Sequence, residues 1–494
     1  MPSNVTGLAS SSIDLSSPDF WAKSLAEREA AFTKLYRFHE PLFFVEPKIP
    51  FVEAGPGYYA LAKHADIVTA SRNPAIFSSA AGALSITDLP SEYNRFSGSM
   101  INMDDPDYRR LRRLVFRSFM RRTVDQLMTH MNAVTATLVD DLIANRGGDF
   151  VTEVAARLPL TVICDLMGIP ASHRDYVRER SDIIMGGIDP DYSVTGESGV
   201  DQRRTADQML TAAFELAQLV GNLAGTFRRQ PTDNVISQVC QPDSDCDCLT
   251  DQEIASFILL VVAGLETTKN AISHGLLLSA SPDQRALWAS DFDRYAPLAI
   301  EEIIRLSSPI VWMRRTLTQD FCLRDCRLRA GDKTLLFYWS ANRDEEIFTE
   351  PHRFDITRDP NLHVGFGAAG HHFCLGAHLA RAQITTMFRE LFRSAPGIPP
   401  CGEPRFLQSN FSNGIKSLPC EFTRARLTPG GRRRCTNSSS AMKTSATSSR
   451  SATGPSVPMP RARRKPSLAG GRRRWPSTDS AISPLTRGCA RRSS

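Results

Sequence analysis

A cysteine at the end of a glycine-rich loop, directly before a strong helical pattern, constrains this chain more than any other feature. Residues 361–383 read NLHVGFGAAGHHFCLGAHLARAQ. Gly367, Gly370 and Gly376 allow tight backbone paths and the close approach of a flat ligand. The positive end of a helix dipole and its free N–H groups favour the thiolate form of Cys374. The loop therefore indicates a ligand site, although a buried structural thiol is the commoner explanation of such a cysteine taken alone.

Helical patterns dominate the rest of the chain, and short extended stretches lie between them. Predicted helices cover residues 206–227, Asp251–Leu278, 296–306 and 375–392. Predicted strands cover Tyr58–Leu61, 314–317, Phe321–Leu323 and 334–337. This mixture predicts a mainly α protein with small β-sheets.

Net charge separates the chain into two parts. The whole sequence carries +6, but residues 424–494 alone carry +16, from seventeen Lys and Arg and the single acid Asp479. Residues 1–423 are therefore acidic, at −10, and contain no internal repeat or linker. We expect one large domain at residues 1–423 and a low-complexity, disordered tail at 424–494. Arginine runs in the tail are compatible with nucleic acid or a membrane surface, but an extension without selected function is the simpler explanation, and we predict no nucleic-acid partner.

Targeting signals and disulfide patterns are not visible in the sequence. Residues 1–17 lack the basic start and the apolar run of a secretory signal. The longest clean apolar stretch, residues 257–265, is far shorter than the roughly 20 residues that span a bilayer. The eleven cysteines are odd in number and scattered, which is typical of reduced thiols. We therefore expect a cytoplasmic protein without an integral membrane anchor.

One bracket of the cysteine loop resembles the haem-binding loop of the cytochrome P450 family: Phe366-Gly367-x-x-Gly370-x-His372-x-Cys374-Leu375-Gly376. The resemblance implies that Cys374 binds the iron of haem b and that Phe366 and Gly376 contact the haem. Two residues, instead of the commoner one, separate the first two glycines. That longer spacing also occurs in actinobacterial members that act on lipids. The resemblance covers about residues 19–423 and implies the single, triangular, mainly α fold of that family.

Two further stretches match the element that supports this loop in the family. Glu302-x-x-Arg305 places a carboxylate and a guanidinium on one helix face, which is uninformative alone. Pro351-His352-Arg353-Phe354 follows about fifty residues later. Together they imply a buried structural core of Glu302, Arg305 and Arg353.

The predicted long helix carries the polar run AGLETT, residues 263–268, after a strongly apolar stretch. A buried carboxylate is costly without a partner. The helix could reach solvent at Glu266, or the Thr267 hydroxyl could bond back to a carbonyl one turn earlier. The resemblance implies instead that Gly264 leaves room for dioxygen and that Glu266 and Thr267 are catalytic residues that relay protons.

Three cationic side chains match the family residues that bind the two haem carboxylates: Arg112, Arg315 and His372. Tyr108 stands where the family usually has histidine, and a phenol can still donate a hydrogen bond. Three more arginines crowd Arg112: Arg109, Arg110 and Arg113. This group could be a solvated basic face or a docking face for an acidic electron-transfer protein.

The resemblance implies a monooxygenase that inserts one oxygen atom of O₂ into a C–H bond of an apolar substrate. No fused flavin or iron–sulfur module is visible, so electrons from NAD(P)H would arrive through a ferredoxin and a ferredoxin reductase. Three stretches resemble actinobacterial enzymes that hydroxylate the chain ends of methyl-branched lipids and sterol side chains: IASFILLVVAGLETTKNAISHG, VWMRRTLTQD and YWSANRDEEIF. The expected pocket residues are all apolar: Leu259, Val262, Ala263, Ile310, Val311, Trp312 and Phe411.

Other functions stay open from the sequence. The substrate could be a terpenoid or another steroid. A peroxide-driven hydroxylase would not need the Glu266–Thr267 pair, which is intact here. A non-catalytic haem-binding protein, such as a sensor or carrier, is a further alternative, and the unusual tail is also compatible with a degraded gene.

Overall fold

The computed structural model describes residues 13–47, 49, 52–89, 99–196, 199–243, 246–396 and 400–421. The division into a domain at residues 1–423 and a tail at 424–494 stays a prediction, because the tail lies outside the described residues. Within the described part the fold is mainly helical with small sheets, as the sequence predicts.

Helices form most of the described chain. In the first half they are α1 (Pro18–Trp21), α2 (Leu25–Tyr36), α3 (His64–Arg72), α5 (Asp107–Phe116), α6 (Arg121–Ala144), a π-helical turn (Val151–Ala155), α7 (Arg157–Met167) and α8 (Arg174–Gly186). In the second half they are α9 (Gln202–Arg229), α10 (Val235–Cys240), α11 (Asp251–Ala255), α12 (Ile258–Leu278), α13 (Pro282–Ser290), α14 (Phe292–Ser307), α15 (Tyr338–Ala341) and α16 (Ala377–Ser394). Three short 3-10 turns lie between the described helices: Met100–Asn102, Arg117–Phe119 and Ala171–His173.

One five-stranded sheet has the order β1-β2-β10-β7-β3, and only β2 and β10 pair in parallel among its described strands. Its strands are β1 (Leu42–Phe44), β2 (Tyr58–Leu61), β3 (Phe77–Ser78), β7 (Trp312–Leu317) and β10 (Lys333–Phe337). The remaining strands pair in twos: β4 (Gly147–Asp149) with β13 (Pro419–Glu421), β5 (Thr195–Gly196) with β6 (Gly199–Val200), β8 (Phe321–Leu323) with β9 (Cys326–Leu328), and β11 (Arg405–Phe406) with β12 (Ile415–Ser417).

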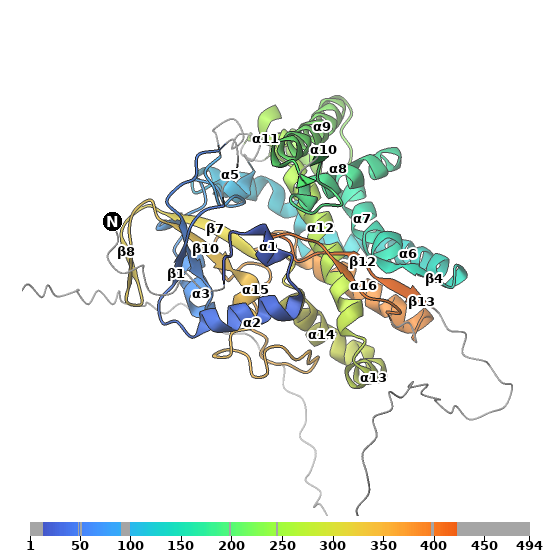
Figure 1. Cartoon of the computed structure of the whole chain (residues 1–494). Helices are drawn as coiled ribbons and strands as arrows, with labels where there is room; N and C mark the ends of the chain where they lie inside the picture. The colour runs from blue at the N-terminus through green and yellow to red at the C-terminus, as the bar shows by residue number, and fades with distance from the viewer. Residues whose placement is uncertain are drawn as a thin grey trace, which may run out of the picture. The chain divides into compact units, whose positions relative to one another are not determined.

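Helix α12 passes through the helical part of the fold, with α16 beside it and the five-stranded sheet on the other side of the molecule (Figure 1). Its apolar residues belong to the largest core cluster, in which Leu265, Ile272 and Leu276 are almost fully buried. The stretch Asp251–Leu278 is long enough to cross a membrane and contains an 18-residue window of mean hydropathy 1.3. However, 62% of that window is buried inside the fold, which is typical of a core helix. Apolar burial explains why this helix is so hydrophobic.

The predicted elements agree with the structure in place and type. The predicted strands coincide with β2 and β8 or lie within β7 and β10, and residues 206–227 and 296–306 lie within α9 and α14. The predicted helix Asp251–Leu278 is divided into α11 and α12. Its start is correct, because Thr250 and Glu253 form a reciprocal capping box. The break follows at Ser256, whose hydroxyl donates to the Glu253 carbonyl at 2.6 Å.

A buried ion pair on α14 organises the chain that leads to the cysteine loop. Glu302 and Arg305 are both 0% exposed, and the Nε and Nη2 atoms of Arg305 donate to the Glu302 carboxylate at 2.7 and 2.8 Å. Arg305 also donates to the carbonyls of Asn342 and Pro351 at 2.7 and 2.6 Å. Asn361 Nδ2 donates back to Glu302 at 3.0 Å. The pair therefore fixes three separate points of the segment between β10 and the loop.

The prediction that Arg353 is the third member of this buried core is wrong. Its guanidinium is 55% exposed and pairs with Glu350 at 2.8 Å, and only its carbonyl accepts from Arg305. Arg358 takes the expected place, because it is 10% exposed and its Nε lies 3.2 Å from Glu302 Oε2. The turn after Glu350 directs Arg353 outward and returns Arg358 to the buried carboxylate.

We predict that Arg305→Ala lowers the free energy of unfolding by about 3–5 kcal/mol, because it leaves the Glu302 carboxylate buried without its main partner. Urea unfolding followed by circular dichroism measures this change. Arg353→Ala is the matched control and should change stability little, since its side chain is exposed. Equal effects of the two substitutions would contradict the assigned roles.

Candidate functional site

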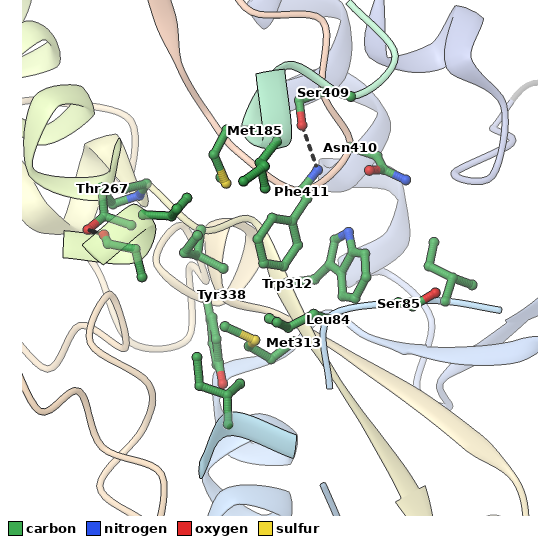
Figure 2. A pocket seen from close by; sticks show the side chains of 18 of the residues that line it. Leu84, Ser85, Met185, Thr267, Trp312, Met313, Tyr338, Ser409, Asn410 and Phe411 are labelled. Carbon is green, nitrogen blue, oxygen red and sulfur yellow. Dashed lines mark hydrogen bonds between the residues drawn. The ribbon is translucent and has the colours of Figure 1, made fainter. Parts of the chain in front are cut away.

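A cavity of about 1100 Å³ is lined by α12, by the loop that precedes α16, and by segments from α5, α8, α9 and β7. Cys374 and Phe366 line it from the loop, and Gly264 and Thr267 line it from α12. Figure 2 shows Thr267, Met185, Trp312, Tyr338 and Phe411 gathered around this space. The predicted site residues from distant parts of the sequence therefore meet at one cavity, with the exception of Glu266.

Backbone hydrogen bonds and close packing set the path of the cysteine loop. Cys374 N donates to Phe366 O at 2.9 Å, and Gly367 adopts φ +76°, a conformation that favours glycine. A Cβ on Gly370 would lie 2.1 Å from the Ser71 carbonyl oxygen, so only glycine fits against α3. Asn342 Oδ1 accepts from Val364 N at 2.7 Å, which connects the loop to the Arg305 network.

The Cys374 thiol is surrounded by protein, and its accessible surface faces the cavity. Burial raises its pKa, against the opposing effects of the Gly376 N–H and the guanidinium groups of Arg112 and Arg381. The expectation that a helix start favours the thiolate is therefore wrong for the thiol as it stands, since burial is the larger effect. Helix α16 begins only at Ala377, three residues beyond the sulfur. A bound metal cation reverses this preference, because thiolates are the ligand form of cysteine.

The predicted carboxylate-binding residues cluster on one side of the cavity. Arg112 donates to the Tyr108 hydroxyl at 2.7 Å and to the Phe373 carbonyl at 2.8 Å. The Tyr108 hydroxyl donates in turn to the His371 carbonyl at 2.5 Å. Tyr108 is thus fully engaged in holding Arg112 against the loop. Arg315, which is 5% exposed, donates to the Arg314 carbonyl at 2.7 Å and also lines the cavity.

His372 belongs to the same cluster and lines the cavity, and one of its ring nitrogens makes no hydrogen bond in the described structure. Its Nε2 atom is buried without a hydrogen-bond partner, and its ring lies 4.3 Å from the Tyr108 ring. Burial, with the positive charges of Arg315 and Arg112, lowers the pKa of His372 to about 3. An anion beside Nε2 would offset this charge and favour the protonated ring, which donates from both nitrogens.

The other arginines of α5 point elsewhere. Arg110 pairs with Asp247 at 2.8 Å and Glu253 at 2.5 Å, and Arg113 pairs with Asp247 at 3.0 Å. Arg109 is 77% exposed beside Asp105. The explanation of Arg112 as one more solvated arginine is therefore wrong, because it alone of the four lines the cavity.

On α12, Thr267 faces the cavity and its hydroxyl donates to the Ala263 carbonyl at 2.7 Å. The back-bonding expected for this residue is confirmed. A Cβ on Gly264 would lie 3.2 Å from Ile163 Cδ1, so a side chain here would crowd α7.

Glu266 is buried, at 2% exposure, and does not line the cavity. Its Oε2 atom lies 2.5 Å from Lys269 Nζ, and Asn270 Nδ2 donates to its Oε1 at 3.0 Å. Lys269 Nζ also lies 3.7 Å from Asp182 on α8. Burial lowers the pKa of Lys269, but the carboxylates of Glu266 and Asp182 raise it overall. The idea that α12 reaches solvent at Glu266 is therefore wrong.

Sequence reasoning missed Lys269, Asp182 and Arg358. The position of Lys269, three residues after a carboxylate on an apolar helix, was the available signal, since residues i and i+3 share a face. Asp182 had no such signal, because α8 and α12 meet only in three dimensions.

The substrate side of the cavity agrees with most of the predicted lining residues. Val262, Ala263, Ile310, Trp312 and Phe411 line it. Val311 does not, because it packs in the core beneath the sheet, and the Leu259 side chain lies outside the described part. Further apolar lining residues come from loops and from α8, α9 and β7: Leu84, Met185, Ile188, Met209 and Met313.

These residues fit a haem group. Such a group needs an axial ligand, open space beside that ligand, and donors for two carboxylates. Cys374 supplies the sulfur, and a Cβ on Gly376 would meet no atom within 4 Å. Arg112 and Arg315, with the unpartnered Nε2 of His372, supply the donors. The ring of Phe366 packs 4.3 Å from the Arg381 guanidinium, which fixes the other side of the loop.

Comparisons with known proteins agree with this geometry. A family model described as "Cytochrome P450" matches residues 294–394. The methyl-branched lipid omega-hydroxylase of Mycobacterium tuberculosis is 43% identical over 416 residues, 83% of this chain and 95% of that protein. The steroid C26-monooxygenase of Mycolicibacterium smegmatis is 33% identical over 400 residues, 79% of this chain and 89% of that protein. A Mycobacterium marinum cytochrome P450 solved in complex with pseudoionone has a TM-score of 0.77 and 37% identity, over 83% of this chain and 99% of that structure.

Proposed function

The chain belongs to the cytochrome P450 family, and from this premise we propose that it hydroxylates the terminal carbon of a methyl-branched lipid or of a sterol side chain. As a member of that family it is a haem-dependent monooxygenase that uses O₂, an apolar substrate and external redox partners. The balanced reaction is R–H + O₂ + two electrons + two protons → R–OH + H₂O. The observation that carries the proposal is one cavity of about 1100 Å³ in which Cys374 and Thr267 meet largely apolar walls.

The substrate class rests on the walls and on the relatives. Proteins 43% and 33% identical over most of this chain are named for chain-end oxidation of methyl-branched lipids and of steroids. Four methionines line the cavity: Met100, Met185, Met209 and Met313. Methionine side chains adapt to irregular apolar ligands, which suits a branched chain.

We assign the cofactor roles by position. Cys374 would bind the iron, and Arg112, Arg315 and His372 would bind the haem carboxylates. Haem held by a thiolate supplies dioxygen binding and promotes O–O cleavage. Phe366 and Gly376 would face the haem from the loop. Tyr108 acts on this group only through Arg112, because both of its hydroxyl hydrogen bonds are internal.

The proton route uses Thr267 and Glu266. The Thr267 hydroxyl is held at the cavity wall by the Ala263 carbonyl and can pass a proton to an acceptor in the cavity. Glu266 is the adjacent proton carrier, but its carboxylate lies outside the cavity, with Oε2 2.5 Å from Lys269 Nζ. Proton delivery from Glu266 therefore requires water to replace Lys269 at Oε2.

Electrons would come from NAD(P)H through a ferredoxin reductase and a ferredoxin. The outer surface near the cysteine loop carries exposed cations on α5 and at the start of α6: Arg109, Arg117, Arg121 and Arg122. The exposed apolar side chains of Phe116 and Met120 lie among them. A basic patch with apolar contacts suits an acidic ferredoxin. A cytoplasmic location is part of the proposal, since all nine described cysteines are free.

We predict that Cys374→Ser abolishes the thiolate-type spectrum of the reduced, carbon monoxide-bound protein, because serine supplies no thiolate. The wild-type protein should show a Soret band at much longer wavelength than histidine-ligated haem proteins. Cys401→Ser, which removes an exposed cysteine, should match the wild type. A histidine-type band in the wild type would remove the assigned ligand.

Turnover tests the substrate class. With NADPH, a ferredoxin and its reductase, we expect 15-methylhexadecanoic acid or cholest-4-en-3-one to give a terminal alcohol, identified by mass spectrometry. Oxidation of pseudoionone alone would favour a terpenoid hydroxylase. Turnover with hydrogen peroxide but not with the reductase would favour a peroxide-driven enzyme, and no O₂ consumption would favour a non-catalytic haem protein.

We predict that Thr267→Ala keeps the spectrum but lowers the product formed per NADPH about tenfold or more, because a positioned proton donor is lost. The diverted electrons should appear as hydrogen peroxide, from O₂, two electrons and two protons. Thr267→Ser keeps the hydroxyl and is the control. Unchanged coupling in the alanine variant would argue against the relay.

A further inference from the structure

Two chain segments close the outer part of the cavity opposite the cysteine loop. One runs from the end of α8 to the start of α9, and contributes Met185, Ile188 and Val200 to the lining. The other joins β11 to β12 and contributes Ser409 and Phe411. Figure 2 labels Met185, Ser409 and Phe411 among the side chains that line the cavity.

The cavity reaches solvent beside these segments. Gln202, at the start of α9, lines the cavity and is exposed, and so is Asp14. Val45 also lines it and is 65% exposed. Because Gln202 directly follows the segment after α8, that segment borders an open part of the cavity, which we call the rim.

A buried ion pair joins the two segments. Asp189 is fully buried, and its Oδ1 atom accepts from Lys416 Nζ at 2.8 Å. Its Oδ2 atom accepts from Gln408 N at 2.7 Å. Lys416, 13% exposed, also reaches Asp191 at 2.7 Å, and the exposed Arg405 pairs with Asp191 at 2.5 Å.

These contacts carry the polar connection between the segments. Among the described residues, the hydrogen bonds and ion pairs between the segment after α8 and the β11–β12 hairpin all involve Asp189 or Asp191. The segment after α8 otherwise bonds to itself and to α9, as in Asp201 N to Val194 O at 2.8 Å and Val194 N to Thr205 Oγ1 at 3.0 Å. It starts at Gly187, which has φ +51° and ends α8. The segment can therefore move relative to the β11–β12 hairpin once Asp189 is released.

We propose that Asp189 and Lys416 are a positioning pair that holds the cavity rim closed over long apolar ligands and thereby limits their exchange. The inference rests on the proposed function and deepens it, because it names what selects a long chain over a short ligand. Met185 and Phe411 lie on the two joined parts of the wall, so a ligand long enough to fill the cavity meets both, whereas a small ligand held near Cys374 does not need to. Losing Lys416 leaves the Asp189 charge without its cation, and exposure of that charge to water favours the open rim.

Alkylimidazoles test the pair without any turnover, since their nitrogen binds the haem iron and shifts its spectrum. Stopped-flow spectroscopy of the ferric holoenzyme would compare 1-dodecylimidazole with imidazole. In Lys416→Met we expect dissociation of 1-dodecylimidazole to be about tenfold faster, which is about 1.4 kcal/mol, and that of imidazole to change less than twofold. Lys416→Arg keeps the positive charge and should restore the wild-type rate.

Equal changes for both ligands, or none in Lys416→Met, would overturn the proposal. If Lys416→Met does not bind haem, Asp189→Asn replaces it, with the same expected difference between the two ligands. A wild-type protein that binds both 1-dodecylimidazole and imidazole but hydroxylates no lipid would contradict the proposed function and leave this test intact.

Discussion

The ion pair of Glu302 and Arg305 is the interaction on which the rest of the site depends. Two fully buried charges are costly, and the cost is offset only when nearly every donor and acceptor is used. Arg305 meets this condition by bonding one carboxylate and three carbonyls. Those carbonyls belong to the chain that leads to the cysteine loop, and Asn342, one of the residues bound, also holds Val364. The position of Cys374 is thus fixed by contacts far from the sulfur.

Charge is distributed unevenly around the cavity. Arg112 and Arg315 gather at one side, where two carboxylates of the cofactor would balance them. Glu266 is held by Lys269 and Asn270 outside the cavity, so the α12 wall presents only uncharged side chains, among them Val262, Ala263, Gly264 and Thr267. Helix α12 can therefore contact an apolar ligand and also carry a proton donor, because the Glu266 carboxylate lies on the neighbouring face of the helix.

Features that depend on a few adjacent residues could be predicted from the sequence. The cysteine loop, the pair on α14 and the capping box of α11 are of this kind, since glycine conformations and i, i+3 spacing act locally. The prediction of Arg353, instead of Arg358, as the partner of the Glu302–Arg305 pair was wrong. Both arginines lie in one turn-rich segment, and only the fold decides which one points inward. Val311 was misplaced for a related reason: alternate residues of an extended chain face opposite sides, and its neighbour Trp312 took the cavity side. The lining from α8 and the link from Asp182 to Lys269 could not be predicted, because they join segments more than eighty residues apart.

Two lysines near the cavity, Lys269 and Lys416, each pair with two carboxylates but connect different elements. Lys269 lies between Glu266 and Asp182 and so joins the core helix α12 to α8. Lys416 lies between Asp189 and Asp191 and joins the segment after α8 to the β11–β12 hairpin. The C-terminal part of α8 and the segment after it are therefore each held by a cation shared between two carboxylates. The two pairs differ in what they join: Lys269 connects two helices of the core, whereas Lys416 connects a loop segment to a hairpin at the cavity wall. Because Asp189 is fully buried, the second connection holds only while Lys416 stays beside it.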